Sequence, residues 1–254
     1  MAEINHVSRE TLSKKIVAIL ADYLICVDQP KIIKAKIILY IDLLRDWSAK
    51  INLTTITEPL DILYKHFLDS LQLLPFLQQE KPLYIADFGS GAGFPGIALA
   101  LFYPSADFFL LEATAKKIQF LEIVKKRLEI TNLIIKQVRV EDFYQDSSHH
   151  NFFDLIIARS FAYLPIFLEL GFGFLQAKGF LVAYKSAKNL HQEIQAAQEF
   201  IRKHNLVFCQ KYTYNILGDA RGLCFFQKKA IIPNYKIRNL KKLKNIYKLQ
   251  GGKN

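Results

Sequence analysis

Residues 87–96, DFGSGAGFPG, constrain the fold of this chain more than any other stretch. They hold four glycines and follow an apolar run from Leu83 to Ala86. A glycine-rich turn between a strand and a helix lets a ligand approach the backbone at the positive end of the helix. The stretch therefore predicts an α/β domain with a ligand site at the carboxyl end of its first strand.

Short apolar strands alternate with helical segments from Leu83 onward. We expect five strands at 83–89, 107–113, 133–140, 153–160 and 179–186, with helices near 96–103, 114–129, 162–176 and 188–203. This alternation is typical of a parallel sheet that is covered on both faces. Two further strands, 206–215 and 222–229, are separated by about seven residues, which predicts an antiparallel hairpin. Such a sheet resembles that of the class I S-adenosylmethionine (SAM)-dependent methyltransferases, a Rossmann-like α/β fold.

The first third of the chain has helical apolar spacing from about residue 9 to residue 80. One of its helices is expected to begin after Thr57 as N-cap, with Pro59 in the first turn, where a missing N–H costs little. We therefore predict three parts: an N-terminal helical region over 1–80 that packs on the core, a SAM-binding core over 81–229, and a basic tail over 230–254.

The net charge of +11 is concentrated at the C-terminal end. Residues 228–254 contain nine Lys or Arg and no acidic residue, so the remainder of the chain is nearly neutral. Such a block binds nucleic acid in many proteins and is simply solvated in others. The apolar residues among these charges predict a basic amphipathic helix, for which we favour RNA binding, with a membrane-surface helix and a solvated helix as the alternatives. They are Ile237, Leu240, Leu243, Ile246 and Tyr247.

The cysteine content and the distribution of apolar residues bear on the cellular compartment of the protein. The three cysteines are far apart and have no CxxC spacing, which favours neither a disulfide framework nor a zinc site. The N-terminal residues lack the pattern of an export signal, and the most apolar stretch, 161–175, is short and interrupted. We expect a cytoplasmic monomer with no bound metal and no membrane contact.

The glycine pattern matches two cofactors. Gly91, Gly93 and Gly96 satisfy the GxGxxG pattern of NAD-binding proteins, whereas Asp87, Gly89, Gly91 and Gly93 satisfy the acidic-x-G-x-G-x-G turn of SAM-dependent enzymes. Asp87 suits the ammonium group of SAM and would repel a pyrophosphate. These residues favour SAM, although either match alone is weak.

Residues around the turn add to this choice. Phe94 and the following proline put a bulky ring and a missing N–H where phosphates need donors. Glu112 closes the second strand and is placed to accept hydrogen bonds from ribose hydroxyls in either class of enzyme. Val140 and Glu141 follow the third strand, where adenine is expected; an ordinary helix cap is the alternative.

The end of the fourth strand, IIARSFAYLP, bears on the methyl acceptor. It lacks the Asn/Asp-Pro-Pro-aromatic motif that positions exocyclic amines, and no cysteine lies near the strand ends as a nucleophile for pyrimidine C5. A ring nitrogen such as guanine N7 needs neither device. Arg159 and Lys185 end the fourth and fifth strands and are expected to position the substrate, although Lys185 could equally be a surface lysine. His66 and Asp69 could cap the pocket, although a structural role is favoured for the histidine. No residue is assigned as catalytic in the strict sense.

Taken together, these stretches resemble the bacterial 16S rRNA guanine-N7 methyltransferase family, RsmG or GidB. The resemblance covers roughly residues 10–228 and rests on segments 51–71, 87–100, 110–121, 139–142 and 153–164. It implies SAM-dependent methylation of N7 of one guanine in the decoding-region loop of 16S rRNA, either naked or within the 30S subunit. It also implies cofactor-site positions at Gly89, Phe94, Glu112, Ala113, Thr114, Val140, Glu141 and Arg159.

The chain departs from the family pattern at two places. Lys185 is followed by Ser186 where the family tends to have glycine, and the basic tail continues past the usual end. Two alternative functions stay open at this point: an NAD-dependent oxidoreductase that uses the same glycine turn, and a non-catalytic RNA-binding ribosome-assembly factor.

Overall fold

A computed structural model describes residues 8–248. Its centre is a seven-stranded sheet with the strand order β3-β2-β1-β4-β5-β7-β6. The strands are β1 (Tyr84–Phe88), β2 (Asp107–Glu112), β3 (Leu133–Gln137), β4 (Phe153–Arg159), β5 (Leu175–Ser186), β6 (Leu206–Ile216) and β7 (Asp219–Lys228). Strands β1 to β5 pair in parallel, whereas β7 is antiparallel to both β5 and β6. The predicted parallel sheet with a terminal hairpin is confirmed.

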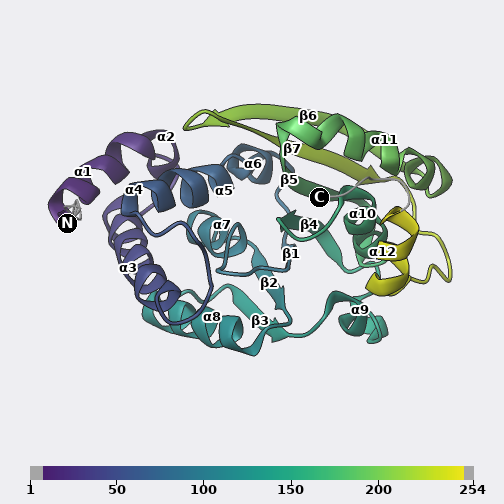
Figure 1. The fold of residues 1–254 in the computed structure, drawn as a ribbon, viewed down its shortest axis with the longest axis horizontal. Coiled ribbons are helices and arrows are strands. Elements are labelled where there is room, and N and C mark those ends of the chain that lie inside the picture. The colour runs from purple at the N-terminus through teal and green to yellow at the C-terminus, as the bar shows by residue number, and fades with distance from the viewer. Residues whose placement is uncertain (1–7, 249–254) are drawn as a thin grey trace.

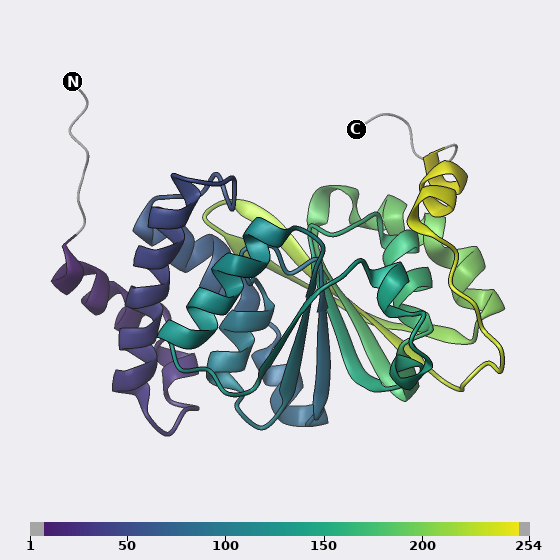
Figure 2. The same ribbon diagram turned by 90° about the horizontal axis from the view of Figure 1, so that it is seen from below.

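Helices cover both faces of this sheet (Figures 1 and 2). The connecting helices are α7 (Gly96–Phe102), α8 (Ala115–Arg127), α9 (Val140–Phe143), the 3-10 turn η2 (Ser147–His149), α10 (Leu164–Phe172) and α11 (Ala187–Lys203). Figure 2 shows the N-terminal helices and α8 on one side of the sheet and α10 and α11 on the other. No helix within residues 8–248 is both long enough and apolar enough to cross a lipid bilayer.

Successive side chains of a strand enter two different cores. In β7, Leu223 and Phe225 pack with the N-terminal helices, while Cys224 and Phe226 pack under α10 and α11. Side chains of a strand alternate between the two faces of a sheet. Because both faces are buried here, the strands are nearly continuous apolar runs in the sequence.

Two connections differ from the sequence-based expectation. The helix α10 ends at Phe172, before the expected residue 176, because the carbonyl of Phe174 already accepts hydrogen bonds from the amides of Phe152 and Phe153. The hairpin strands extend until only Leu217 and Gly218 remain between them, in place of about seven residues. Both residues have positive φ angles, of 51° and 90°, as two-residue hairpin turns require.

The N-terminal region is helical, as expected. It consists of α1 (Arg9–Ile19), α2 (Ala21–Leu24), α3 (Pro30–Ser48), α4 (Pro59–Ile62), the π-helix η1 (Leu63–Leu68), α5 (Asp69–Leu71) and α6 (Leu74–Glu80). The residue that caps α4 is Glu58, not Thr57, because Pro59 occupies the first helical position. Side chains of this region and of the sheet share one core.

The tail contains α12 (Leu240–Lys248), which lies against α10 (Figure 1). Its Leu243 is fully buried in the core below α10 and α11. The expected amphipathic helix therefore forms, and its apolar face is covered by protein. The last residues of the expected tail, 249–254, lie outside the described residues.

A buried lysine fastens the end of β7 to the rest of the sheet. Lys228 is 1% exposed, and its Nζ donates to Asn151 Oδ1 at 2.7 Å and to the carbonyls of Phe172 and Leu175 at 2.9 and 2.7 Å. Lys228→Met leaves these acceptors unpaired, so we expect the free energy of unfolding to fall by roughly 2–4 kcal/mol in urea titrations. The neighbouring exposed Lys229→Met is expected to change it by less than about 0.5 kcal/mol; equal losses would contradict the role given to Lys228.

Candidate functional site

The glycine-rich loop connects the carboxyl end of β1 to α7. Gly89, Gly91 and Gly93 have φ angles of 68°, 58° and 89°, a left-handed backbone that glycine adopts at little steric cost. The amides of Gly89 and Ser90 donate to the carbonyl of Leu111 at 2.9 and 3.2 Å, which holds the loop against the end of β2. A Cβ on Gly91 would find no atom nearer than 3.8 Å, so the loop presents accessible backbone at this point.

Glu112 connects this loop to the next strand. Its Oε2 accepts a hydrogen bond from the amide of Gly91 at 3.1 Å, and its Oε1 accepts one from the amide of Thr114 at 2.8 Å. The carboxylate therefore lies beside the open face of the loop, where ribose hydroxyls are expected from the sequence. Ala113 and Thr114 follow it at the exposed start of α8.

The carboxylate of Asp87 lies beneath the loop and is 1% exposed. Its Oδ2 accepts from the amide of Gly96 at 2.9 Å, whereas its Oδ1 has no hydrogen-bond partner among residues 8–248. Burial raises the pKa of this carboxyl to about 7, against the opposing effect of the Gly96 amide. A buried carboxylate with a free oxygen suits a cationic group and disfavours a phosphate, so the residues fit SAM.

Val140 and Glu141 begin the short helix α9, after the end of β3. The amide of Val138 donates to the carbonyl of Glu112 at 3.1 Å, so this segment lies directly beside the end of β2. Val140 is buried and Glu141 is partly exposed. The carboxyl ends of β1, β2 and β3 thus bring the loop, Glu112 and α9 to one edge of the sheet.

Phe94 lies on the far side of the loop, in the packing against the N-terminal helices. Its ring is 4% exposed and is stacked between Tyr40 and His66, at centroid distances of 5.0 and 4.8 Å. The Tyr40 hydroxyl donates to the carbonyl of Ala92 in the loop. Phe94 was predicted at the cofactor site, but its side chain is buried in the wall behind that site.

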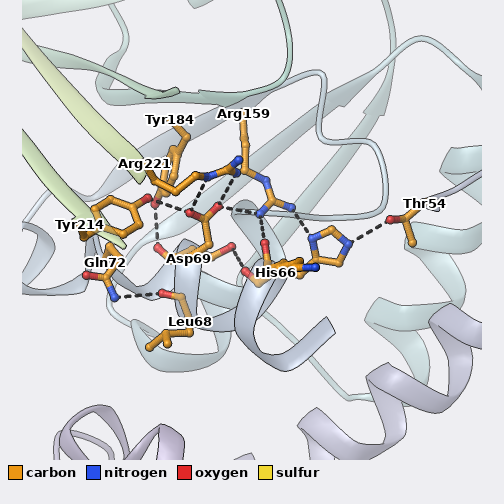
Figure 3. A network of polar contacts seen from close by, with 11 residues as sticks. Thr54, His66, Leu68, Asp69, Gln72, Arg159, Tyr184, Tyr214 and Arg221 are labelled. Atoms are coloured by element: carbon orange, nitrogen blue, oxygen red, sulfur yellow. Dashed lines mark hydrogen bonds and ion pairs between the residues drawn. The ribbon is translucent and has the colours of Figure 1, made fainter. Parts of the chain in front are cut away.

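Polar side chains from several segments converge on the buried carboxylate of Asp69 (Figure 3). Asp69 is 1% exposed, and its Oδ2 accepts from Arg159 Nη1 at 2.9 Å and from Arg221 Nη2 at 3.3 Å. Its Oδ1 accepts from the Tyr214 hydroxyl at 2.8 Å. Burial alone would raise the pKa of Asp69, but the two guanidinium groups outweigh burial and lower it. Asp69 is therefore an ionised centre that connects α5, β4, β6 and β7.

Arg159 also fixes the state of the neighbouring histidine. Its Nη2 donates to His66 Nδ1 at 3.0 Å, so that nitrogen must accept, and the ring proton lies on Nε2, which donates to Thr54 Oγ1 at 3.1 Å. Burial, followed by the charge of Arg159, lowers the pKa of His66 to about 3. The imidazole is neutral at physiological pH. His66 lies in the π-helix η1, a distortion that is frequent at functional sites.

These groups line a pocket of about 230 Å³. Pockets for whole drug-sized ligands usually measure about 300–1,000 Å³, so this one suits a single ring or phosphate. Its lining includes Lys65, His66, Asp69, Arg159, Ser160 and Arg221. Within residues 8–248, no cluster of His, Cys, Asp and Glu side chains is arranged to hold a metal ion.

Lys185 is fastened to the scaffold and does not line this pocket. Its Nζ lies 2.6 Å from Glu193 Oε2 and donates to the carbonyl of Ala162 at 2.7 Å. From the sequence, Lys185 was predicted to lie with Arg159 over the opening. The difference arises because α11 supplies a carboxylate, Glu193, that neutralises it.

Sequence reasoning missed two contributors to this site, Arg221 and Tyr214. Both come from the hairpin, where β7 places Arg221 opposite Ser186 of β5 and Tyr214 of β6. No local motif marks either residue. The i, i+3 spacing of His66 and Asp69 did indicate their shared face.

Removal of the central charge should be costly. Asp69→Asn leaves two arginines without their shared carboxylate, and we expect a loss of about 3–5 kcal/mol in the free energy of unfolding. Asp61→Asn on the same helical segment is the control, because its pair with Lys65 has side-chain exposures of 41% and 32%, and such pairs contribute about 0.3–0.5 kcal/mol. Chemical denaturation measures both. Similar losses in the two variants would show that Asp69 is not central to the fold.

The histidine predicts a pH dependence of stability. Its pKa is about 3 when folded and 6.5 when unfolded, so only the unfolded chain binds the proton between these values. The contribution of the neutral His66 side chain to the free energy of unfolding is therefore complete above pH 6.5. Below pH 6.5 it falls by about 1.4 kcal/mol per pH unit. We expect the difference in unfolding free energy between the wild type and His66→Asn to change by about 2–3 kcal/mol from pH 7 to pH 4.5, in favour of the variant. A constant difference across this range would mean that His66 is not held neutral.

Solved structures of methyltransferases share this fold. The O-methyltransferase from Bacillus cereus in complex with SAH has a TM-score of 0.59 at 15% identity, covering 87% of this chain and 100% of that protein. A putative O-methyltransferase from Klebsiella pneumoniae has a TM-score of 0.57 at 13% identity, covering 75% and 90%. At such identities the likeness concerns the fold alone, and it confirms the class I methyltransferase architecture.

Sequence comparison is more specific. The GidB family model, described as rRNA small subunit methyltransferase G, matches residues 33–217. A relative named ribosomal RNA small subunit methyltransferase G, from Desulfitobacterium hafniense, is 40% identical over 200 residues, which cover 78% of this chain and 82% of the relative. A relative of the same name from Streptococcus equi subsp. zooepidemicus is 38% identical over 199 residues, covering 77% and 83%. With the glycine loop and the arginine-lined pocket in place, these matches show that the chain belongs to the GidB family of rRNA small subunit methyltransferase G proteins.

Proposed function

We propose that this chain methylates N7 of one guanine in 16S rRNA. As a member of the GidB family it is a SAM-dependent methyltransferase of small-subunit rRNA. Family membership thus decides against the NAD-dependent oxidoreductase and the non-catalytic assembly factor. The guanine atom and the residues that act on it are the proposal.

The edge formed by β1, β2 and β3 is the proposed cofactor site. SAM supplies an electrophilic methyl group when it is bound there. Asp87 attracts the ammonium group, the loop backbone accommodates the methionine part, and Glu112 accepts from the ribose. Val140 and Glu141 of α9 are assigned to the adenine ring. The full proposed set is Asp87, Gly89, Gly91, Gly93, the backbone of Phe94, Glu112, Ala113, Thr114, Val140 and Glu141, with Arg159 at the boundary.

One observation carries the proposal: the glycine loop and the arginine-lined pocket share a wall. The end of β4 lies between them: a Cβ on Gly89 of the loop would stand 2.6 Å from Phe161 Cδ2, and Phe161 directly follows Arg159 and Ser160, which line the pocket. A donor bound at the loop and a base held in the pocket would therefore be neighbours. Positioning of this kind can supply much of the acceleration of a group transfer.

The ionisation states in the pocket support a nitrogen acceptor with a free lone pair. His66 is neutral, and both of its ring nitrogens are engaged in hydrogen bonds. Asp69 is ionised, and its two oxygens accept from two arginines and a tyrosine. Neither group is free to remove a proton. Guanine N7 carries no proton, so its methylation needs none removed.

The two arginines differ in how many N–H donors they have available for the substrate. Arg159 is committed to the carbonyl of Lys65, to Asp69 and to His66, which leaves two of its five N–H donors. The Arg221 side chain is 30% exposed against 10% for Arg159, and Asp69 uses two of its donors. Arg221 is thus the more accessible donor for a guanine O6 or a backbone phosphate.

The proposal is tested by transfer of tritiated methyl groups to 30S subunits and to naked 16S rRNA from a strain that lacks the modification. Label should appear at a single guanine that becomes cleavable by borohydride and aniline. Because a paired guanidinium contact contributes about 1–3 kcal/mol, Arg221→Ala should lower kcat/KM roughly tenfold or more, with SAM affinity within about twofold of wild type.

The matched control is Arg202→Ala, an exposed arginine in the last turn of α11. It should leave both quantities unchanged. Label that resists aniline cleavage would contradict N7 as the acceptor. An unaltered kcat/KM for Arg221→Ala would remove Arg221 from the substrate site.

A further inference from the structure

We infer that the outer face of α12 is an RNA-binding surface that holds the rRNA backbone beside the arginine-lined pocket. This surface, the α12 lysine face, consists of Lys241, Lys242 and Lys244, all exposed. It lies beyond residue 217, where the match to the family model ends. The inference rests on the proposed function for the identity of the RNA.

The α12 lysine face has a fixed place on the molecule. Leu243 is fully buried, and Ile237, Leu240 and Tyr247 pack against the same core. Asn239 caps the helix, since its Oδ1 accepts from the amide of Lys242 at 2.8 Å. A helix anchored in this way presents its lysines in one direction.

The segment before the helix is anchored as well. Arg238 forms an ion pair with Glu169 of α10, whose side chain is 3% exposed. The Tyr235 hydroxyl donates to the carbonyl of Glu169 at 2.9 Å, and the Tyr144 hydroxyl donates to the carbonyl of Tyr235 at 2.8 Å. The segment is thus attached by polar contacts to α10 and to Tyr144, which ends α9.

The anchored helix also lies near the substrate opening. The Tyr247 ring packs edge-on against Tyr163, with the centroids 6.4 Å apart. Tyr163 caps α10 and is separated by three residues from Arg159, which lines the pocket together with Ser160. An RNA strand whose base enters the pocket would pass the loop between β4 and α10 and reach α12.

The charge of the face is not compensated within the protein. Among the described residues no carboxylate forms an ion pair with Lys241, Lys242 or Lys244. Lys241 and Lys244 are three residues apart on the helix, so their side chains are neighbours and their like charges repel each other. A polyanion relieves the repulsion and releases counterions on binding.

The burial of the apolar face selects RNA over a lipid surface. A helix that binds a membrane surface inserts its apolar residues among the lipids. In α12 these residues pack on α10 and α11, as Leu243 shows most clearly. The exposed residues of α12 are Lys241, Lys242, Lys244 and Asn245, and their positive charge suits a phosphate backbone.

Salt dependence tests the inference. Each phosphate contact contributes about 0.7 to 0.9 to the slope of log K against log salt concentration. The triple variant Lys241→Gln/Lys242→Gln/Lys244→Gln should therefore reduce the slope for 16S rRNA by about 2 to 3 in filter binding. It should raise the KM for 30S subunits and leave kcat at saturating substrate unchanged. A triple Lys→Arg variant at the same positions should retain the wild-type slope.

The matched control replaces three exposed lysines elsewhere, Lys15, Lys31 and Lys126, by glutamine. It should bind as the wild type does. A wild-type slope in the α12 triple variant would overturn the inference. So would loss of binding to vesicles of anionic phospholipid without a change in RNA binding, which would make the face a lipid site. A wild type that shows the RNA slope but labels no guanine would refute the proposed function and leave the surface intact.

Discussion

The buried carboxylate of Asp69 is the interaction on which the site depends. It joins the helical region to Arg159, 90 residues away, and to Arg221, 152 residues away. Removing a carboxylate from water costs several kcal/mol, and such burial is sustained only when opposite charges and hydrogen-bond donors surround the group. Two guanidinium groups and the Tyr214 hydroxyl meet that requirement. The arrangement of the polar side chains in the pocket therefore follows from the need to pair the Asp69 carboxylate with hydrogen-bond donors and positive charges.

The N-terminal helices are accordingly part of the site. Tyr40 of α3 supports the glycine loop through Ala92 and stacks on Phe94, which in turn stacks on His66 of η1. The same helices contribute Lys65 and Asp69 to the pocket. A chain consisting of the sheet and its connecting helices alone would lack one wall of both proposed sites.

The polar groups act by position. His66 is held neutral and Asp69 is held ionised, so both are structural partners of Arg159. Asp87 differs, because burial raises its pKa and its Oδ1 has no hydrogen-bond partner in the described part of the chain. The pocket is satisfied internally, whereas the cofactor edge keeps an unsatisfied group for a ligand. This contrast is consistent with a reaction that needs alignment and no proton relay.

Several features of this chain follow from local physics and are predictable from its sequence. The glycines at 89, 91 and 93 predict a left-handed loop, the apolar runs predict a sheet that is buried on both faces, and the apolar spacing of the tail predicts its helix. The i, i+3 spacing of His66 and Asp69 predicts that they share one face. Three other features are visible only in the folded protein: Lys185 is neutralised by Glu193, the Phe94 ring is buried, and Arg221 reaches Asp69. These contacts depend on strand register and on packing between segments far apart in the chain. No local sequence pattern indicates which charged groups will pair across such distances.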